Sequence, residues 1–231
     1  MRLRPTLRRL WRVGAGGAEG SLPLIAPQQG YERWAESYGR ELNPVQQLEA
    51  RALAGILPDL RDRVVLDLGA GKGRVSRLAL ERGARATVGM DFSLPMVRAA
   101  AAARTAAAHW LAGDAQRLPF RRHAFDVVVC ALMLGHVQDL DAALTGIAEI
   151  VRPGGTLLIS DFHPYATLRG WQRAFLDDAS GQEYAIEQHV HLFERYVGCL
   201  RPLGFELEAL REPLYEGFPL VFALRARKAL P

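Results

Sequence analysis

A glycine-rich turn with the sequence Gly69-Ala70-Gly71-Lys72-Gly73 follows the apolar run 64–68. Glycines let a backbone turn tightly and approach a ligand closely, and the free N–H groups at the start of a following helix attract a negatively charged group. In an open parallel sheet, ligands bind beyond the carboxyl ends of the strands, where such a turn lies. The turn therefore predicts a site for a nucleotide-like ligand that carries an anionic group.

Two carboxylates stand at the ends of the next two expected strands. Asp91 lies roughly twenty residues past the glycines, where a carboxylate can accept hydrogen bonds from both ribose hydroxyls of a nucleoside. Asp114 ends the third expected strand, where it can accept a hydrogen bond from an adenine amino group. The segment 152–155, Arg-Pro-Gly-Gly, is expected to stop a helix and turn into the fifth strand. These features together indicate a nucleoside ligand.

The glycine spacing separates two classes of cofactor. Gly69, Gly71 and Gly73 alternate, whereas the dinucleotide pattern of NAD(P)-dependent oxidoreductases has its third glycine one position later, where Arg74 stands. Asp114 has no role in that class either. An NAD(P)-dependent oxidoreductase remains the alternative enzyme class. A catalytically silent cofactor-binding module is the alternative outside the enzymes.

The histidines supply candidates for a general base, because histidine titrates nearest to neutral pH. His163 is the first candidate because it comes soon after the fifth expected strand, and a structural hydrogen bond is its alternative role. The other candidates are His136, His189 and His191. The last two would share one face of a strand, but no carboxylate or cysteine accompanies them at ligand spacing. We therefore predict no metal site.

Short apolar runs alternate with helical patterns, and these elements must position the residues above. The expected parallel strands are 64–68, 86–90, 109–112, 125–130 and 156–160. The expected helices are 31–40, 44–57, 74–82, 95–108, 140–151 and 191–201. Parallel neighbours need crossover connections, which the helices supply. We expect an α/β, doubly wound, Rossmann-like fold with a mainly parallel seven-stranded sheet, in which 205–210 and 218–226 form an antiparallel C-terminal hairpin.

Composition divides the chain into two parts. Residues 1–29 combine arginines with glycines and prolines and lack apolar periodicity, which predicts a flexible basic leader. Residues 30–231 are expected to form one domain. Within it, the aromatic-rich segment 162–190 is longer than an ordinary connector and is expected to be a substrate lid or insertion.

The charge and the cysteines limit the partners and the compartment. The formal net charge of +4 is largely explained by arginines in the leader, so it does not indicate a nucleic-acid partner. There is no apolar run of membrane-spanning length, and the two cysteines have no paired spacing. These observations favour a cytoplasmic protein without stable membrane insertion. They leave its oligomeric state open.

Taken in order, these motifs make residues 31–164 resemble the class I S-adenosylmethionine-dependent methyltransferase family. The resemblance is to its small-molecule branch, which includes ubiquinone and menaquinone methyltransferases. It implies S-adenosylmethionine as the cofactor and methyl transfer by in-line displacement to a small, partly apolar organic acceptor. Residues 30–231 would then be the methyltransferase domain. The residues Cys130-Ala131-Leu132-Met133 replace the Asn-Pro-Pro-Tyr-like motif that a nucleic-acid methyltransferase would carry, so the expected partner is a small molecule.

The resemblance also implies a set of cofactor contacts. The methionine part would be held by Asp67 and by the turn residues Gly69, Ala70, Gly71 and Gly73. The nucleoside would contact Asp91, Phe92, Asp114 and Ala115, and the residues from Cys130 to Leu132 would line the site after the fourth strand.

Tyr31, Trp34 and Tyr38 resemble an N-terminal helix that closes over the cofactor in this family. Their ring faces could favour the cationic sulfonium, and the alternative for Trp34 and Tyr38 is ordinary core packing. Gly39 departs from the family pattern, which often has an aspartate at that position.

Overall fold

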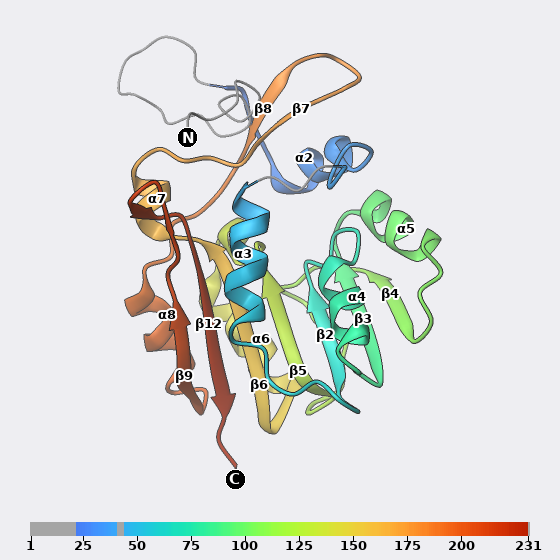
Figure 1. The fold of residues 1–231 in the computed structure, drawn as a ribbon, viewed down its shortest axis with the longest axis vertical. Helices are drawn as coiled ribbons and strands as arrows, with labels where there is room; N and C mark the ends of the chain where they lie inside the picture. The colour runs from blue at the N-terminus through green and yellow to red at the C-terminus, as the bar shows by residue number, and fades with distance from the viewer. Residues whose placement is uncertain (1–21, 41–43, 231) are drawn as a thin grey trace.

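The central sheet has seven strands in the order β4-β3-β2-β5-β6-β12-β9 (Figure 1). The structure is a computed structural model and describes residues 22–40 and 44–230. The strands are β2 (Val64–Leu68), β3 (Ala86–Asp91), β4 (Ala108–Ala112), β5 (Phe125–Ala131), β6 (Val151–Phe162), β9 (Phe205–Arg211) and β12 (Val221–Lys228). The first five pair in parallel, whereas β12 runs antiparallel to both β6 and β9. The predicted fold class, with its antiparallel C-terminal pair, is confirmed.

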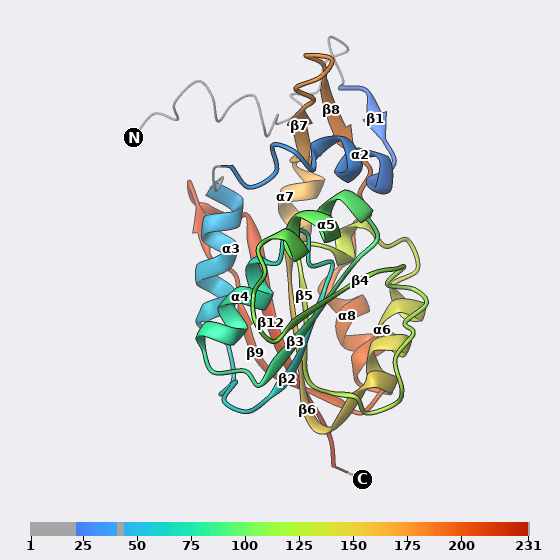
Figure 2. The same cartoon turned by 90° about the vertical axis from the view of Figure 1, so that its right-hand side faces the viewer.

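Helices cover both faces of this sheet. They are α3 (Pro44–Ala54), α4 (Arg74–Glu81), α5 (Leu94–Ala102), α6 (Leu140–Ile150) and α8 (Phe193–Leu200). Figure 2 shows α3 and α4 on one side of the sheet and α6 and α8 on the other. This arrangement follows from the parallel strand pairs, because each crossover must pack a helix against the sheet.

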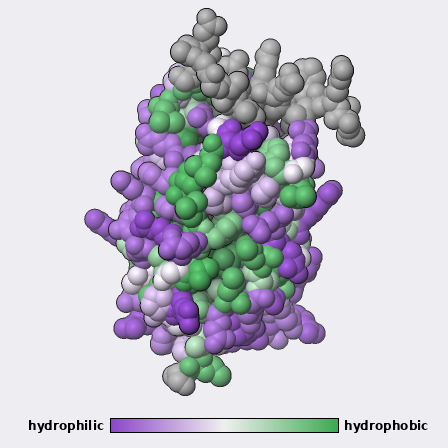
Figure 3. All heavy atoms as spheres, turned by 90° about the vertical axis from the view of Figure 1, so that its left-hand side faces the viewer, coloured by the Kyte–Doolittle hydropathy of each residue, from purple (hydrophilic) through white to green (hydrophobic). Residues whose placement is uncertain are grey.

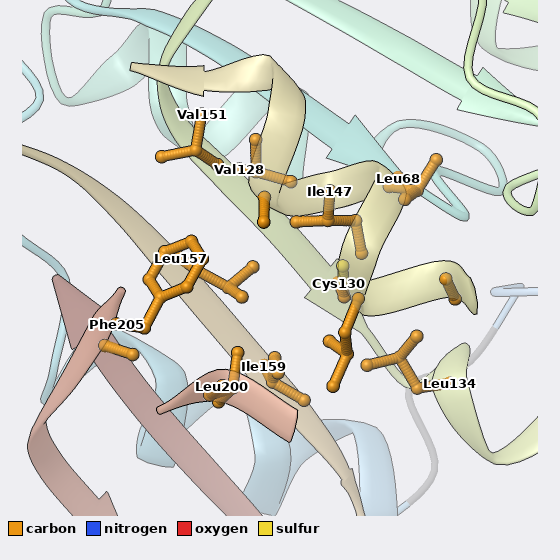
Figure 4. Close-up of a cluster of buried hydrophobic side chains, with 14 of the residues drawn as sticks. Leu68, Val128, Cys130, Leu134, Ile147, Val151, Leu157, Ile159, Leu200 and Phe205 are labelled. Atoms are coloured by element: carbon orange, nitrogen blue, oxygen red, sulfur yellow. The ribbon is translucent and has the colours of Figure 1, made fainter. Parts of the chain in front are cut away.

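Strand β5 shows why both faces are apolar. Successive side chains of a strand point to opposite faces. Val127 and Val129 accordingly pack with residues of α3 and α4, whereas Val128 and Cys130 pack with residues of α6. Figure 4 shows the second cluster, in which Leu157, Ile147 and other residues from several elements pack together with Val128 and Cys130 of β5. Each fully buried aliphatic side chain contributes about 1.5–3 kcal/mol to this core.

Helix α5 is shorter than its sequence predicts. The alanine run favours a helix through residue 108, but α5 ends at Ala102, and Arg104 and Ala107 have positive φ values of 47° and 61°. The chain must reverse there because β4 begins at Ala108 and pairs with β3. Tertiary pairing thus overrides the helix propensity of alanine.

Strand β6 is longer than expected, and the Arg-Pro-Gly-Gly segment does not form a turn before it. The strand already begins at Val151, which pairs with Phe125, and a register shift follows between Phe125 and Val127. Arg152 forms an ion pair with Asp126 on β5. The irregular pairing accommodates the proline and glycines inside the strand.

The last expected strand is interrupted. Residues 218–219 form β11 (Phe218–Pro219), which pairs with β10 (Leu214–Tyr215), and β12 follows separately. Two helices near the termini also differ in their bounds from the expected 31–40 and 191–201: α2 is Pro27–Trp34, and α8 begins at Phe193.

A small second sheet in the order β1-β8-β7 lies beside α2 at one end of the central sheet (Figure 1). Its strands are β1 (Leu24–Ile25), β7 (Ala174–Leu176) and β8 (Glu183–Ile186), and α7 (Pro164–Leu168) precedes β7. We call residues 163–190 the lid segment; its function as a lid stays a prediction. The segment begins one residue later than expected because β6 extends to Phe162.

The expected leader is too long. Residues 22–29 form β1 and the start of α2, because β1 pairs in parallel with β8 and Ile25 packs against Phe175 and Ile186. These partners lie far away in the sequence, so the local composition gives no sign of them. The remainder of the expected leader, residues 1–21, lies outside the described residues.

Apolar side chains also reach the surface on the face that carries α8 and β9, where Figure 3 shows hydrophobic areas among hydrophilic ones. Val197 of α8 and Leu207 of β9 are exposed there. Within residues 22–40 and 44–230, no helix combines the length and the apolar character needed to cross a membrane.

Candidate functional site

A cavity of about 350 Å³ lies between α2 and the carboxyl ends of β2, β3, β4 and β5. The sequence-predicted site residues that line it are Tyr31, Gly69, Gly71, Asp91, Phe92, Asp114 and Ala115. Those that do not line it are Asp67, Ala70, Gly73, Cys130 and His163. The chain order places this cavity where the strand sequence reverses between β2 and β5, which is where open α/β sheets bind ligands.

Two glycines of the turn, Gly69 and Gly73, leave no room for a side chain. Gly69 and Gly73 have positive φ values of 71° and 77°. A Cβ on Gly69 would lie 2.6 Å from Met133 Cβ, and one on Gly73 would lie 2.1 Å from the Trp110 ring. The backbone N–H of Gly69 also donates to Met90 O over 2.8 Å. Glycine is therefore required here by backbone conformation and by packing.

Asp67, at the end of β2, holds this turn in place through hydrogen bonds to α4. Its Oδ2 accepts hydrogen bonds from the backbone N–H of Ser76 over 2.9 Å and from the Ser76 hydroxyl over 2.8 Å. The carboxyl group is buried, and burial raises its pKa to about 6. Asp67 thus joins the end of β2 to the first turn of α4. Its partner, Ser76, was not identified from the sequence.

Asp91 joins the glycine turn to α5. Its Oδ2 accepts from Gly71 N–H and its Oδ1 from Ser93 N–H, each over 2.8 Å. Burial raises the pKa of Asp91, while the two N–H donors oppose that shift. Each carboxylate oxygen keeps further acceptor capacity. Asp91 can therefore accept hydroxyl hydrogens in the cavity while it holds the turn.

The far end of the cavity carries the residues expected near an adenine. Phe92 lies edge-on to Tyr31, with ring centroids 6.1 Å apart. Asp114 is exposed, and its Oδ1 accepts from Gln116 N–H over 2.9 Å. Gln116 also lines the cavity, as does Ala115. The apolar ring of Phe92 and the polar residues Asp114 and Gln116 thus line the same end of the cavity.

The aromatic residues of the N-terminal segment divide into two groups. Tyr31 and Tyr38 line the cavity, whereas Trp34 stacks on Phe175 of the lid segment at 5.3 Å between ring centroids. Trp34 therefore has a packing role. Tyr38 lines the cavity, which is the position that an interaction with the cationic sulfonium requires. Pro27 also lines the cavity, although the sequence analysis assigned it to the leader. The sequence feature that could have placed Pro27 in a helix is proline's preference for the first helical turn, since Pro27 starts α2.

His163 lies outside the cavity lining. Its Nδ1 accepts from Tyr165 N–H over 3.1 Å at the start of α7, and its Nε2 lies 2.8 Å from Glu212 Oε1. These contacts correspond to the structural role that the sequence left open for it.

His136 is the candidate histidine that lines the cavity among the described residues. Its Nε2 lies 3.0 Å from Tyr31 Oη and 2.7 Å from Arg173 Nη1, and its Nδ1 lies 2.7 Å from Glu187 O. The pKa of His136 is well below the ordinary histidine value, first because it is buried and then because Arg173 is close. Sequence reasoning had not identified Arg173, because a single arginine in an irregular segment gives no local signal.

Cys130 contributes to the core instead of the cavity surface. It is fully buried in the cluster with α6, and burial raises the pKa of its thiol. The three residues that follow it, Ala131, Leu132 and Met133, line the cavity. Of the expected lining residues 130–132, Ala131 and Leu132 therefore line the cavity, whereas the Cys130 side chain points to the other face of the sheet.

His189 and His191 lie in a loop between β8 and α8, and not on a strand. Their ring centroids are 6.3 Å apart, and His191 Nε2 contacts Val137 O at 2.8 Å. Over the described ranges, no group of three or more His, Cys, Asp or Glu side chains lies close enough together to hold a metal ion.

Residues 66–159 match the methyltransferase domain family. The malonyl-[acyl-carrier protein] O-methyltransferase of Xylella fastidiosa (strain M23) is 34% identical over 146 residues, which cover 59% of this chain and 48% of the relative. The demethylmenaquinone methyltransferase of Mycolicibacterium paratuberculosis (strain ATCC BAA-968 / K-10) is 41% identical over 112 residues, which cover 48% of this chain and 46% of the relative. The chain thus spans about half the length of these curated relatives.

The fold has solved counterparts. The crystal structure of an S-adenosylmethionine dependent methyltransferase from Mesorhizobium loti superimposes with a TM-score of 0.68 at 22% identity, over 78% of this chain and 98% of that one. Residues 66–159 thus match the methyltransferase domain family, and the fold is that of S-adenosylmethionine-dependent methyltransferases of known structure.

Proposed function

We propose that this chain binds S-adenosylmethionine in the cavity and transfers its methyl group to a small, partly apolar organic acceptor. The observation that carries the proposal is that the glycine turn, Asp91 and Asp114 line one cavity of about 350 Å³. The match of residues 66–159 to the methyltransferase domain family and the named relatives, all methyltransferases, support the reaction type.

The donor set fits each part of this cofactor. Gly69 and Gly71 offer backbone at the start of α4 for the methionine part, and Asp67 holds that turn through Ser76. Asp91 offers carboxylate oxygens for the ribose hydroxyls, and Phe92, Asp114 and Ala115 surround the adenine position. We assign Ala70 and Gly73 to the geometry of the turn, and Cys130 to the support of the strand end.

When bound, S-adenosylmethionine supplies a methyl group on a positively charged sulfur for in-line displacement by a nucleophile. The chain's own contribution is to hold the two reactants in line and to exclude water. The ring faces of Tyr31 and Tyr38 favour a cation in the cavity. The apolar side chains of Leu132, Met133 and Val137 favour a partly apolar acceptor.

No histidine enters this proposal as a general base. His163 lies outside the cavity lining, and the Nε2 of His136 already faces a guanidinium group. Positioning of the acceptor is therefore the source of catalysis that the described residues support.

Titration of the purified chain with adenosylhomocysteine and with NADH, by calorimetry, tests the cofactor. We expect adenosylhomocysteine to bind and Asp91→Asn to weaken its binding about 10- to 100-fold, the value of hydrogen bonds to a charged acceptor. The exposed lid carboxylate Asp178 supplies the control variant, Asp178→Asn, which should bind as the wild type does. Binding of NADH alone would overturn the proposal in favour of an oxidoreductase.

Turnover separates an enzyme from a silent module. The protein would be incubated with S-adenosylmethionine and a panel of quinols, malonyl thioesters, phenols and carboxylic acids, with formation of adenosylhomocysteine as the readout. The names of the relatives make quinols and malonyl thioesters the first members of the panel. We expect methylation of at least one class. Cofactor binding without any turnover across acceptor classes would favour the silent module.

A further inference from the structure

A polar chain of four side chains, two of them buried and two partly buried, connects the lid segment to the cofactor cavity. It runs from Asp161 at the end of β6 through Arg173 and His136 to Tyr31 of α2. Asp161 Oδ2 accepts from Gly135 N–H over 2.7 Å, so the chain is also anchored to the backbone after β5. Its members come from four separate elements and meet only in the folded protein.

Arg173 is the charged centre of this chain. It stands directly before β7, is 3% exposed, donates to Asp161, and lies over the Phe162 ring at 4.9 Å from the centroid. A buried guanidinium needs partners that satisfy its charge and its donors. Asp161 balances the charge, and His136 Nε2 accepts from Arg173 Nη1.

The lid segment holds both nitrogens of His136. The Glu187 carbonyl, directly after β8, can only accept, so Nδ1 carries the hydrogen and donates to it over 2.7 Å. The lone pair therefore lies on Nε2, which accepts from Arg173 over 2.7 Å. The ring orientation of His136 is thus set by residues at the ends of two lid strands. Protonation of Nε2 would abolish this acceptor, which argues against a general-base role.

Tyr31 is the next member of the chain after His136. Its hydroxyl lies 3.0 Å from the same Nε2 and donates to the lone pair that Arg173 also uses, and the two rings meet edge-on at 5.3 Å between centroids. The Tyr31 ring lines the cofactor cavity and also contacts Phe92. A displacement of His136 therefore moves an aromatic wall of the cavity.

We propose that His136 is a positioning residue through which Arg173 and the lid segment hold Tyr31 in place over the cofactor. The lid segment thereby controls cofactor affinity without any contact of Arg173 with the cavity. This inference rests on the proposed function, because it assigns a cofactor to the cavity that Tyr31 lines.

A double-mutant cycle tests it. Tyr31→Phe removes one hydroxyl and keeps the ring, and His136→Ala removes the group that holds it. In the wild-type background, Tyr31→Phe should weaken adenosylhomocysteine binding about fivefold, the net value of one hydrogen bond. In the His136→Ala background, the same change should have no further effect, because the hydroxyl has already lost its partner. His136→Gln, whose amide oxygen can accept, should restore part of the affinity.

Matched controls come from the same regions. Tyr184 lies on β8, and its hydroxyl accepts from Arg33 outside the cavity, so Tyr184→Phe should keep wild-type affinity. The exposed His123 provides His123→Gln. Thermal unfolding of each variant reports separately on folding.

The outcomes are distinct. Wild-type protein that fails to bind adenosylhomocysteine would overturn the proposed function and this inference together. Wild-type binding with an equal loss for Tyr31→Phe in both backgrounds would overturn the inference alone. If His136→Ala does not fold, Tyr31→Phe decides by itself: unchanged affinity rejects the role of the hydroxyl, and a fivefold loss without loss of thermal stability supports it.

Discussion

The glycine turn differs in its construction from the polar chain of Asp161, Arg173, His136 and Tyr31, which we call the lid contact. In the turn, Asp91 binds the backbone of Gly71 across 20 residues, and Asp67 binds Ser76 across 9. In the lid contact, Tyr31 and His136 are 105 residues apart and interact through side chains only. The turn depends on backbone shape within one strand–helix–strand unit, whereas the lid contact depends on polar side chains from distant segments. Added volume should therefore damage the first, and loss of a charge should damage the second.

The largest effect is expected at the lid contact, from Arg173→Met. This change leaves the Asp161 carboxylate buried without its counter-charge, which costs about 3–5 kcal/mol of unfolding free energy. Urea unfolding measures the loss. Arg195 pairs with Asp141 at the exposed surface, so Arg195→Met should cost less than about 1 kcal/mol. Equal costs for the two arginines would show that the buried chain has no special energetic role.

A second test adds one methyl group to the turn, in Gly73→Ala. The added Cβ meets the Trp110 ring in a backbone conformation with φ of 77°, so strain and overpacking together should cost about 2–5 kcal/mol. Gly217 has φ of 88° and nothing within 4 Å of an added Cβ, so Gly217→Ala isolates the backbone cost of about 1–2 kcal/mol. Unfolding curves that show no difference between the two variants would contradict the packing argument.

The pH dependence of stability distinguishes the two regions by sign. Burial raises the pKa of Asp67 to about 6, above the value of about 3.9 in an unfolded chain. Between these values the folded state binds the extra proton, so the contribution of Asp67 to stability falls as pH rises from about 4 to 6. Asp67→Asn should therefore gain up to about 3 kcal/mol over the wild type across this window. Urea unfolding at several pH values checks this, and a pH-independent difference would contradict it.

His136 should act in the opposite direction. Its pKa lies well below the ordinary value in the folded protein, so the unfolded chain binds the proton first when pH falls below about 6.5. The stability that neutral His136 contributes is present above that pH and is lost as pH falls toward its folded pKa. In the same titration, His136→Gln should lose less stability than the wild type on acidification.

The sequence predicted the cofactor cavity better than the residues at its acceptor side. Gly69, Gly71 and Asp91 were predictable because their roles depend on the ends of two neighbouring strands, which apolar runs mark clearly. His163 and His136 each follow a parallel strand, and the local pattern favoured His163 only because it comes soon after the fifth expected strand. The strand order decides between them: β5 lies beside β2 at the reversal point, whereas β6 lies one strand further away.

The N-terminal segment shows a second limit. Residues 22–29 resemble a leader in composition, yet β1 is held by pairing with β8, about 160 residues away, and Pro27 reaches the cavity. Backbone pairing between distant segments leaves no local periodicity, particularly in a strand of two residues.

The sequence by itself determined the doubly wound fold, the glycine turn and the carboxylates beside it. It could do so because strand periodicity, turn glycines and end-of-strand residues are local properties of the chain. Only the tertiary structure decided that Asp67 holds the turn through a hydrogen bond to Ser76 and that His136, not His163, lines the cavity. It also decided that His136 connects Arg173 to Tyr31. Each of these depends on which face of the sheet a side chain occupies and which distant segment packs there, and burial then fixes the charge and the hydrogen-bond partners.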